Sequence, residues 1–213
     1  MEKPPSWRLP EGVSSSLWDY IHSEDVAGEY DKRLEGSPLF EQDARFVQTH
    51  CPTPGKLIDL GCGTGRMLTA CSRQGHWVLG VDLSEAMLGQ ARKRGQREQA
   101  DIHLLQANLT DLRCLADRNF DYAICLFSTL GMILGDACRQ RVVESAHRLL
   151  RPGGRLILHV HNRWFSVWDS AGRRWLLVEG WRRMMNHLHA GDRPMPVHQG
   201  VAGLSLHHFT RGE

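Results

Sequence analysis

The sequence predicts an α/β fold, a doubly wound and mostly parallel sheet with helices on both faces. Two observations carry this prediction. Between residues 57 and 160, short apolar runs alternate with segments of helical periodicity, a pattern typical of parallel sheets. The first run, at residues 57–60, leads into a glycine-rich turn and then into a helix. The chain of 213 residues is long enough for one sizeable core and short for two domains, so a single domain is expected.

Before the first strand, the sequence predicts an N-terminal arm and helical cap over residues 1–50. Residues 1–13 are rich in proline and polar residues and are expected to form a loose arm. One or two short helices, interrupted near Gly28, are expected from residue 14 to about residue 34. Another helix is expected over about residues 37–50, and it leads into the first strand.

The core is expected over residues 51–162. After the first strand, four further segments predict strands: residues 76–82, residues 101–109 with their closing turn, residues 120–127, and residues 148–158, which open with a helix end and a Pro-Gly-Gly turn. Ser84, directly after the second strand, is a suitable cap for the helix that follows. Strands that alternate with helices in this way place their carboxyl ends along one edge of the sheet.

The glycine-rich turn indicates a nucleotide-type site. Glycines at alternate positions allow backbone conformations closed to other residues and let a ligand approach without meeting a Cβ. The free N–H groups of the following helix favour a negatively charged or polar ligand group. A nicotinamide or flavin enzyme would have the spacing Gly-x-Gly-x-x-Gly, whereas here Gly61, Gly63 and Gly65 alternate and Asp59 stands two residues before them. A carboxylate at that place repels pyrophosphate and attracts a cationic amino group.

The pattern Asp59-Leu60-Gly61-Cys62-Gly63-Thr64-Gly65 resembles the first motif of the class I S-adenosylmethionine-dependent methyltransferases. The other segments follow in the family's order, so the resemblance implies a Rossmann-like methyltransferase fold with S-adenosyl-L-methionine as cofactor. In that family the turn holds the methionine portion of the cofactor. The resemblance implies these cofactor-binding residues: Asp59, Gly61, Cys62, Gly63, Gly65, Asp82, Leu83, Asn108, Leu109, Leu126 and Tyr30.

Three of these candidates carry specific expectations. Asp82, at the end of the second strand, is suited to accept hydrogen bonds from both ribose hydroxyls, although dinucleotide enzymes use an acid at the same place. Asn108 stands where the family commonly has an aspartate that accepts from the adenine amino group, and its amide keeps an acceptor oxygen without the charge. Tyr30 resembles a tyrosine that closes over the cofactor in many members; packing of its ring against the core is the alternative.

Methyl transfer from a sulfonium needs no metal and little acid–base help when the nucleophile is good, so no metal site is expected. A hydroxyl or carbon acid would need a base, for which His161 is the candidate. His161 and His159 alternate at the end of the fifth strand and so share a face. A hydrogen-bonded histidine with a structural role is the alternative. The adjacent His207 and His208 would point to opposite faces of a strand, which argues against a shared metal.

Residues 163–213 differ in character from the core. Four tryptophans and five arginines lie within residues 162–183. The resemblance makes residues 163–213 a substrate-side segment with a terminal strand; a lid packed by tryptophans is the alternative. Residues 200–209 predict a strand, and residues 210–213 predict the start of a helix. Because family members continue into two final strands, the C-terminal strands are expected to be missing or atypical. Either the chain is truncated at Glu213 or the last strand-like stretch replaces them.

The expected function is methyl transfer from S-adenosyl-L-methionine to a small-molecule O, N or C acceptor. An RNA or protein methyltransferase and a truncated, non-catalytic S-adenosylmethionine-binding protein stay open as alternatives. Nucleic acid is not favoured because the net charge is only +2. No membrane partner is expected, since no apolar run approaches the ~20 residues that span a bilayer. The six scattered cysteines predict reduced thiols in a cytoplasmic protein. The oligomeric state is left open.

Overall fold

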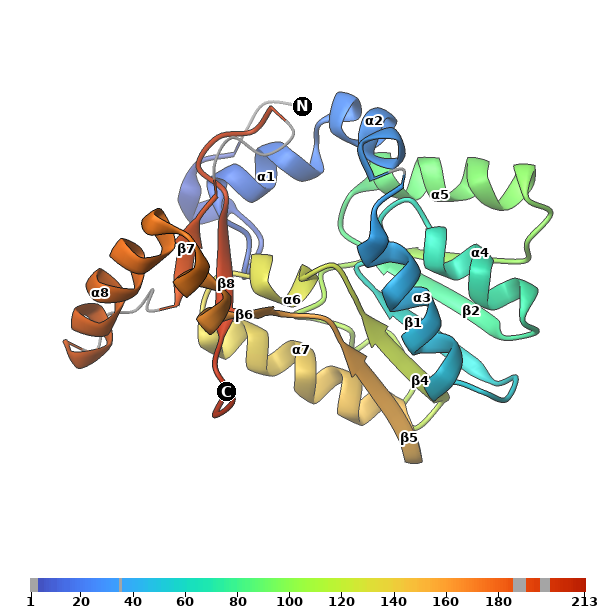
Figure 1. Ribbon diagram of the computed structural model, residues 1–213. Helices are drawn as coiled ribbons and strands as arrows, with labels where there is room; N and C mark the ends of the chain where they lie inside the picture. Colours follow the sequence, from blue (N-terminus) through green and yellow to red (C-terminus); the bar gives the residue numbers. More distant parts are fainter. Residues whose placement is uncertain (1–3, 35, 186–190, 196–199) are drawn as a thin grey trace.

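The computed structural model describes residues 4–34, 36–185, 191–195 and 200–213. The first residues of the predicted arm (1–3) and two parts of the C-terminal segment (186–190 and 196–199) lie outside the described residues. The elements in chain order, with η for a 3₁₀-helix, are η1 (Ser6–Arg8), α1 (Ser15–Ile21), α2 (Glu24–Leu34), α3 (Pro38–His50), β1 (Lys56–Leu60), α4 (Arg66–Arg73), β2 (Trp77–Asp82), α5 (Glu85–Arg97), β3 (His103–Gln106), β4 (Phe120–Cys125), α6 (Thr129–Met132), α7 (Asp136–Leu149), β5 (Leu150–Leu158), β6 (His161–Asn162), η2 (Arg163–Trp168), α8 (Ser170–Met184), β7 (Asp192–Pro194) and β8 (Ser205–Phe209) (Figure 1).

Five parallel strands form the central sheet in the order β3-β2-β1-β4-β5. β1 lies in the middle, where Ile58 is paired with Leu79 of β2 on one side and with Ala123 of β4 on the other. From β1 the chain winds outward through β2 and β3, then returns and winds the other way through β4 and β5. This confirms the predicted doubly wound α/β fold. The strand order reverses beside β1, and open parallel sheets bind ligands beyond the carboxyl ends at such a point.

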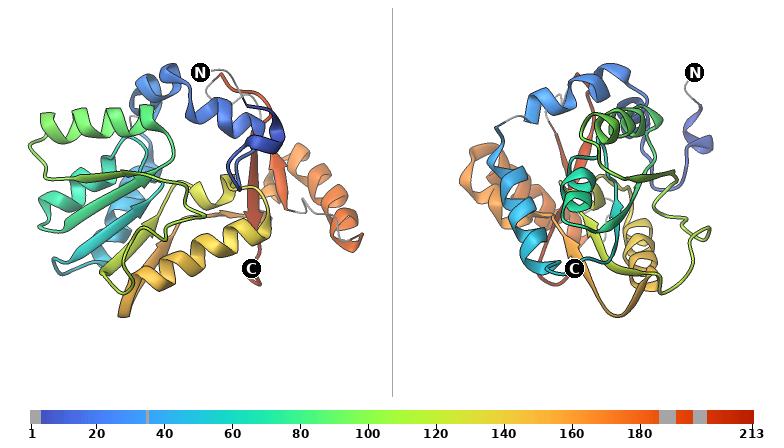
Figure 2. Two further views of the ribbon diagram at one scale, coloured as in Figure 1. Left: turned by 180° about the vertical axis from the view of Figure 1, so that it is seen from behind. Right: turned by 90° about the vertical axis from the view of Figure 1, so that its right-hand side faces the viewer.

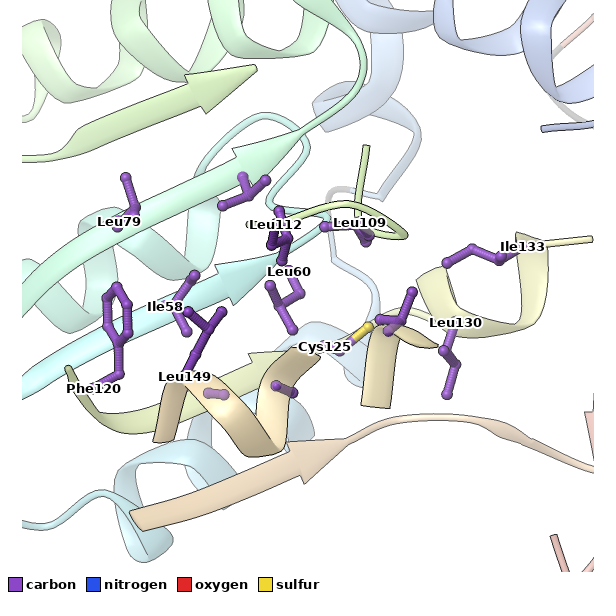
Figure 3. Packing of buried hydrophobic residues seen from close by; sticks show 14 of the residues in the cluster. Ile58, Leu60, Leu79, Leu109, Leu112, Phe120, Cys125, Leu130, Ile133 and Leu149 are labelled. Atoms are coloured by element: carbon purple, nitrogen blue, oxygen red, sulfur yellow. The ribbon is translucent and has the colours of Figure 1, made fainter. Parts of the chain in front are cut away.

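The core consists of two layers, one on each face of the sheet. Leu57 of β1 packs on one face with Val47 of α3 and with residues of α4. Its neighbour Ile58 points the other way, into a cluster with Val142 and Leu149 of α7 (Figure 3). Figure 2 shows the helices on both sides of the strands. Because both faces are covered, the carboxyl edge of the sheet is the place left for a ligand.

The Pro-Gly-Gly triplet at residues 152–154 lies inside β5, whereas the sequence predicted a turn before the strand. Phe120 of β4 pairs with Leu150, yet Tyr122 pairs with Arg155, so β5 contains extra residues at this point. Gly153 has a φ of 81°, a left-handed conformation that favours glycine. The triplet is therefore a bulge in an edge strand.

The N-terminal cap differs from the prediction in two respects. The helix break falls at His22 and Ser23, between α1 and α2, and α2 runs through Gly28 without interruption. Ser23 marks the boundary because its hydroxyl accepts a hydrogen bond from the N–H of Val26 in the first turn of α2. The end of the predicted loose arm is packed against the core, since the carbonyl of Gly12 accepts a hydrogen bond from Leu134 N–H at 2.8 Å.

The C-terminal segment forms a second sheet of three short strands in the order β6-β8-β7. β8 pairs in parallel with β6 and antiparallel with β7, and it does not join the central sheet. It lies against α6, where a Cβ on Gly131 would come within 3.0 Å of the His207 carbonyl. Residues 210–213 form a turn instead of the predicted helix start, with the Thr210 N–H donating to Glu213. The last strand-like stretch thus exists but does not extend the main sheet.

Two expectations drawn from the composition, about membrane-spanning segments and about the cysteines, can be compared with the fold. None of the described helices is long and apolar enough to cross a bilayer. All six cysteines are free thiols and five of them are buried, as expected for reduced cysteines that act as small apolar residues.

Candidate functional site

A cavity lies at the carboxyl ends of β1, β2 and β4, below helices α1 and α2 (Figure 1). It is the place that the sheet topology predicts for a ligand. Ten of the eleven predicted cofactor-binding residues line it: Asp59, Gly61, Cys62, Gly63, Asp82, Leu83, Asn108, Leu109, Leu126 and Tyr30. Gly65 does not line it.

The three glycines of the turn have different tasks, although all have positive φ. A Cβ on Gly61 would come within 2.3 Å of the Thr129 side chain, so Gly61 allows α6 to approach β1. A Cβ on Gly65 would come within 2.9 Å of Ala91, so Gly65 allows α4 to pack against α5. A Cβ on Gly63 would meet nothing within 4 Å. Gly63 is therefore the glycine whose missing side chain leaves space in the cavity.

Asp59 is a buried acid at the base of the cavity. Its side chain is 3% exposed, and no donor in the described part of the chain hydrogen-bonds to its carboxylate. Burial, with a smaller contribution from the charge of Asp82, raises the pKa of Asp59 to about 8. A buried carboxyl group without a partner favours its neutral form until a cation approaches. This corner of the cavity is thus suited to bind a positively charged group.

Asp82 organises the turn from the end of β2. One carboxylate oxygen accepts a hydrogen bond from Gly63 N–H at 2.8 Å, and the other accepts one from Ser84 N–H at 2.9 Å. Burial raises the pKa of Asp82 while these backbone hydrogen bonds lower it. Each oxygen of a carboxylate can accept more than one hydrogen bond, so the side chain can hold the turn and still receive hydroxyl groups from a ligand.

Asn108 lies at the far end of the cavity and already has partners. Its amide nitrogen donates to the Glu11 carbonyl at 2.9 Å, and its oxygen accepts from Thr110 N–H at 3.1 Å. The side chain therefore attaches the N-terminal arm to the loop after β3. One lone pair of the oxygen remains for a ligand donor. Leu83 and Leu109 line this end with apolar surface suited to a flat ring.

Helix α2 covers the glycine turn through Asp31. The Thr64 hydroxyl donates to Asp31 at 2.7 Å, and Arg94 of α5 forms an ion pair with the same carboxylate at 2.5 Å. Tyr30, the neighbouring residue, faces the cavity, and burial raises its pKa. The phenol consequently stays neutral at physiological pH.

Arg66, the first residue of α4, places a guanidinium group at the cavity wall among three aromatic rings. The guanidinium carbon lies 4.6 Å from the centre of the Phe40 ring, 5.1 Å from that of Phe127 and 5.7 Å from that of Tyr30. Its side chain is only 13% exposed, and burial lowers its pKa. Sequence reasoning did not select Arg66, since the rings come from three distant segments.

Sequence reasoning also missed a part of the wall supplied by the arm and by α6. Glu11, Gly12 and Val13 line the cavity, as do Met132 and Ile133 at the end of α6. The burial of Val13 at 7% exposure shows how closely this segment packs. A single apolar residue in a polar, proline-containing stretch carries no periodic pattern, so the sequence offered no clear means of finding it.

His161 does not line the cavity and is exposed to solvent. It begins β6 instead of continuing β5, and its Nδ1 contacts the hydroxyl of Ser128. Ser128 is buried between Phe127 and Thr129, which do line the cavity. Desolvation, and to a smaller degree the neighbouring His159, lower the pKa of His161. Neither His161 nor Ser128 lines the cavity.

The histidines around His161 have different surroundings. His159 lies 2.7 Å from Asp43, whose hydrogen bond raises the pKa of the imidazole. His207 lies 2.8 Å from Asp192, whereas His208 lies beside the ring of His161 at 5.6 Å between centroids. Within the described residues, no group of three or more His, Cys, Asp or Glu side chains is placed to hold a metal ion.

The tryptophan- and arginine-rich residues 163–184 form η2 and α8. None of the described residues beyond Ile133 lines the cavity. In Figure 1, α8 lies on the outer side of the small sheet, away from α4 and α5. Most aromatic side chains of η2 and α8 lie at the surface of the molecule, and Trp168 is 79% exposed.

Comparison with known proteins finds relatives over the core of the chain. A family model described as a methyltransferase domain matches residues 57–154. The dTDP-3-amino-3,4,6-trideoxy-alpha-D-glucopyranose N,N-dimethyltransferase of Streptomyces venezuelae is 29% identical over 177 residues, which are 78% of this chain and 70% of that protein. The ubiquinone biosynthesis O-methyltransferase of Coxiella burnetii is 27% identical over 125 residues, 58% of this chain and 51% of that protein.

A solved structure shares the architecture. The SAM-dependent methyltransferase from Methanosarcina mazei superposes with a TM-score of 0.62 at 20% identity, covering 75% of this chain and 74% of that one. At that identity the likeness shows the fold alone. The chain spans little more than half the length of several curated relatives that it matches.

Proposed function

We propose that this chain, which belongs to the class I S-adenosylmethionine-dependent methyltransferases, transfers a methyl group from S-adenosyl-L-methionine to a small-molecule acceptor. The observation that carries the proposal is the pair of acids in the cavity. Asp59 is buried without a donor at the base, and Asp82 holds the open turn at Gly63. This arrangement suits a ligand with a cation at one end and hydroxyl groups in its middle.

The residues that line the cavity support S-adenosyl-L-methionine as its ligand. Asp59 would hold the cationic amino group of the methionine portion, because an adjacent positive charge favours the ionised carboxylate. The space at Gly63 admits the ligand close to the backbone. Asp82 would accept from the ribose hydroxyls. Leu83 and Leu109 would enclose the adenine ring, with Asn108 beside them.

When bound, this cofactor supplies a methyl group on a positively charged sulfur, activated for transfer. The protein's task is then to align the acceptor and to exclude water. The cap formed by α1 and α2 performs the second task, since Leu17, Tyr20 and Tyr30 cover the cavity. Asp31 holds this cap to the glycine turn through Thr64 and Arg94.

The cavity provides little help with deprotonation. Among the described residues that line it there is no histidine, and burial raises the pKa values of both Tyr20 and Tyr30. His161, the candidate base from the sequence, contacts Ser128 and does not line the cavity. We therefore assign His161 a positioning role for the segment between Phe127 and Thr129. An acceptor that enters with an available lone pair suits this site best.

A small acceptor is supported by the shape and chemistry of the wall. Apolar side chains of the arm, the cap, α3 and α6 line much of the cavity, among them Val13, Leu17, Phe40, Met132 and Ile133. The two named relatives act, by their names, on an amino sugar nucleotide and in ubiquinone biosynthesis. Their names include both an N- and an O-methyltransferase, so the proposal leaves the acceptor atom open.

Calorimetry and a transfer assay test the proposal. We expect the chain to bind S-adenosyl-L-methionine and not NAD, and Asp82→Ala to weaken that binding. A screen with labelled cofactor against small amines, phenols and sugars, with RNA and protein in parallel, then addresses the acceptor. Transfer to RNA or protein alone would contradict the small-molecule assignment. Tight NAD binding without binding of S-adenosyl-L-methionine would contradict the site.

A further inference from the structure

Helix α8 carries an apolar stripe on its outer side. Leu177, Trp181 and Met184 are 78%, 57% and 74% exposed, and their spacing of four and three residues places them on one helix face. Val178, 51% exposed, widens the stripe. The other side of the helix packs inward, where Glu179 is fully buried. Large apolar side chains aligned on the solvent side of a helix are unusual in a soluble domain.

The charges beside this stripe are positive. Arg173 and Arg174 lie one turn before Leu177, so they share its face. Of the two acids of the segment, Glu179 is buried. Asp169 accepts a backbone hydrogen bond at the start of α8, lies 3.3 Å from an arginine of β7, and is close enough to Arg173 for that charge to contribute to lowering its pKa. No ion pair joins Arg174 to a carboxylate of the described residues. The outer face of α8 is therefore apolar at its centre and basic at its N-terminal end.

The adjoining 3₁₀-helix η2 adds exposed aromatic surface. Trp164, Phe165 and Trp168 are 60%, 67% and 79% exposed. α8 packs closely on η2, since a Cβ on Gly172 would come within 2.2 Å of the Ser166 carbonyl. With roughly 150–250 Å² for each aromatic side chain, the exposed part of these three residues and of Trp181 amounts to hundreds of Å². A surface of that size marks an interaction site.

We propose that η2 and α8 attach the protein peripherally to an anionic lipid surface. Tryptophan and arginine are the residues that occupy the boundary between lipid headgroups and acyl chains, and leucine and methionine suit the acyl side. Arg173 and Arg174 would face the lipid phosphates. A dimer in which two copies of α8 pack in parallel would bring these arginines toward those of the second copy, which like-charge repulsion opposes. An antiparallel dimer would keep them apart, so self-association is one of the outcomes that the test distinguishes. RNA binding depends on aromatic and basic side chains, so it would not account for the exposed aliphatic residues at the centre of the stripe.

The test measures sedimentation of the 213-residue chain with vesicles of phosphatidylcholine alone and of phosphatidylcholine mixed with phosphatidylglycerol. We expect sedimentation with the mixed vesicles only, decreasing as salt is raised. Arg174→Glu replaces one attraction by one repulsion and should lower the partition coefficient roughly 30-fold. Leu177→Glu should lower it at least about 10-fold, because a charge replaces an apolar side chain at the contact.

Matched controls separate this surface from general effects of added charge. Arg92→Glu on α5 and Leu39→Glu on α3 introduce the same changes at other exposed positions and should sediment like the wild type. All four variants should keep the wild-type thermal unfolding and the binding of S-adenosyl-L-methionine, because none of the four positions lines the cavity.

Four results would overturn the proposal. The first is that the chain does not sediment with mixed vesicles, and the second is that it sediments equally with phosphatidylcholine alone. The third is that the control variants lose as much binding as the α8 variants. The fourth is that the chain does not bind vesicles but self-associates or binds RNA, and that Leu177→Glu abolishes this association.

Discussion

Replacing Asp59 with asparagine should remove a pH-dependent loss of stability from the ligand-free chain. Asp59 is 3% exposed, and burial raises its pKa to about 8, compared with about 3.9 for an exposed aspartate. Between these values the folded chain keeps a proton that the unfolded chain has released. The free energy of unfolding of the wild type therefore falls as pH rises through this range. Asparagine has nearly the same shape and does not titrate.

The size of the effect follows from the pKa shift. Each pH unit between the two pKa values is worth about 1.4 kcal/mol, so about 3–4 kcal/mol is expected from about pH 5 to about pH 8. For a chain of this length, 1 kcal/mol moves the melting temperature by about 2–4 °C. Without ligand, the melting temperature of Asp59→Asn relative to that of the wild type should therefore increase by roughly 10 °C from about pH 5 to about pH 8. Asp101→Asn, at an exposed position, serves as the control and should follow the wild type.

The same carboxylate should couple pH to cofactor binding. The cationic amino group of S-adenosyl-L-methionine should lower the pKa of Asp59, so binding near neutral pH should release a proton. Calorimetry in buffers of different ionisation enthalpy measures that release, which Asp59→Asn should abolish together with part of the affinity. Identical pH curves for the wild type and Asp59→Asn, or unchanged binding by the variant, would refute the reasoning about this residue.

Three further predictions concern the turn and its surroundings. Asp82→Ala removes the acceptor for Gly63 N–H and for ribose hydroxyls, so calorimetry should show affinity for S-adenosyl-L-methionine lower by about 2–4 kcal/mol; wild-type affinity would contradict the assignment. Gly63→Val should abolish binding and lower the melting temperature through its positive φ, whereas Gly65→Val adds a clash with Ala91 to the same strain and should lower the melting temperature further; the reverse ranking would exclude the roles given to these glycines. Asn108→Asp places an oxygen against the Glu11 carbonyl, so its free energy of unfolding should fall by about 0.5–1.5 kcal/mol, and an unchanged melting temperature would show that this contact is unimportant.

The sequence determined the parallel sheet, its five strands and many of the residues that line the candidate cavity. Strands such as residues 122–125 are continuous apolar runs because both faces of the sheet are buried. The glycine turn and the acids at residues 59 and 82 follow directly after or within these strands, so local order in the chain placed them at one edge. These features depend on contacts between neighbouring residues and on the strand period, which a sequence shows directly.

Only the tertiary structure decided which distant segments meet at the site. The rings around Arg66 come from α2, α3 and the loop after β4, and the arm reaches the cavity because Gly12 bonds to Leu134. His161 was expected at the end of the fifth strand, yet it pairs with β8, contacts Ser128 and does not line the cavity. No residue pattern encodes such pairings, because the contacts that stabilise them join residues far apart in the chain and depend on the packing of the whole domain.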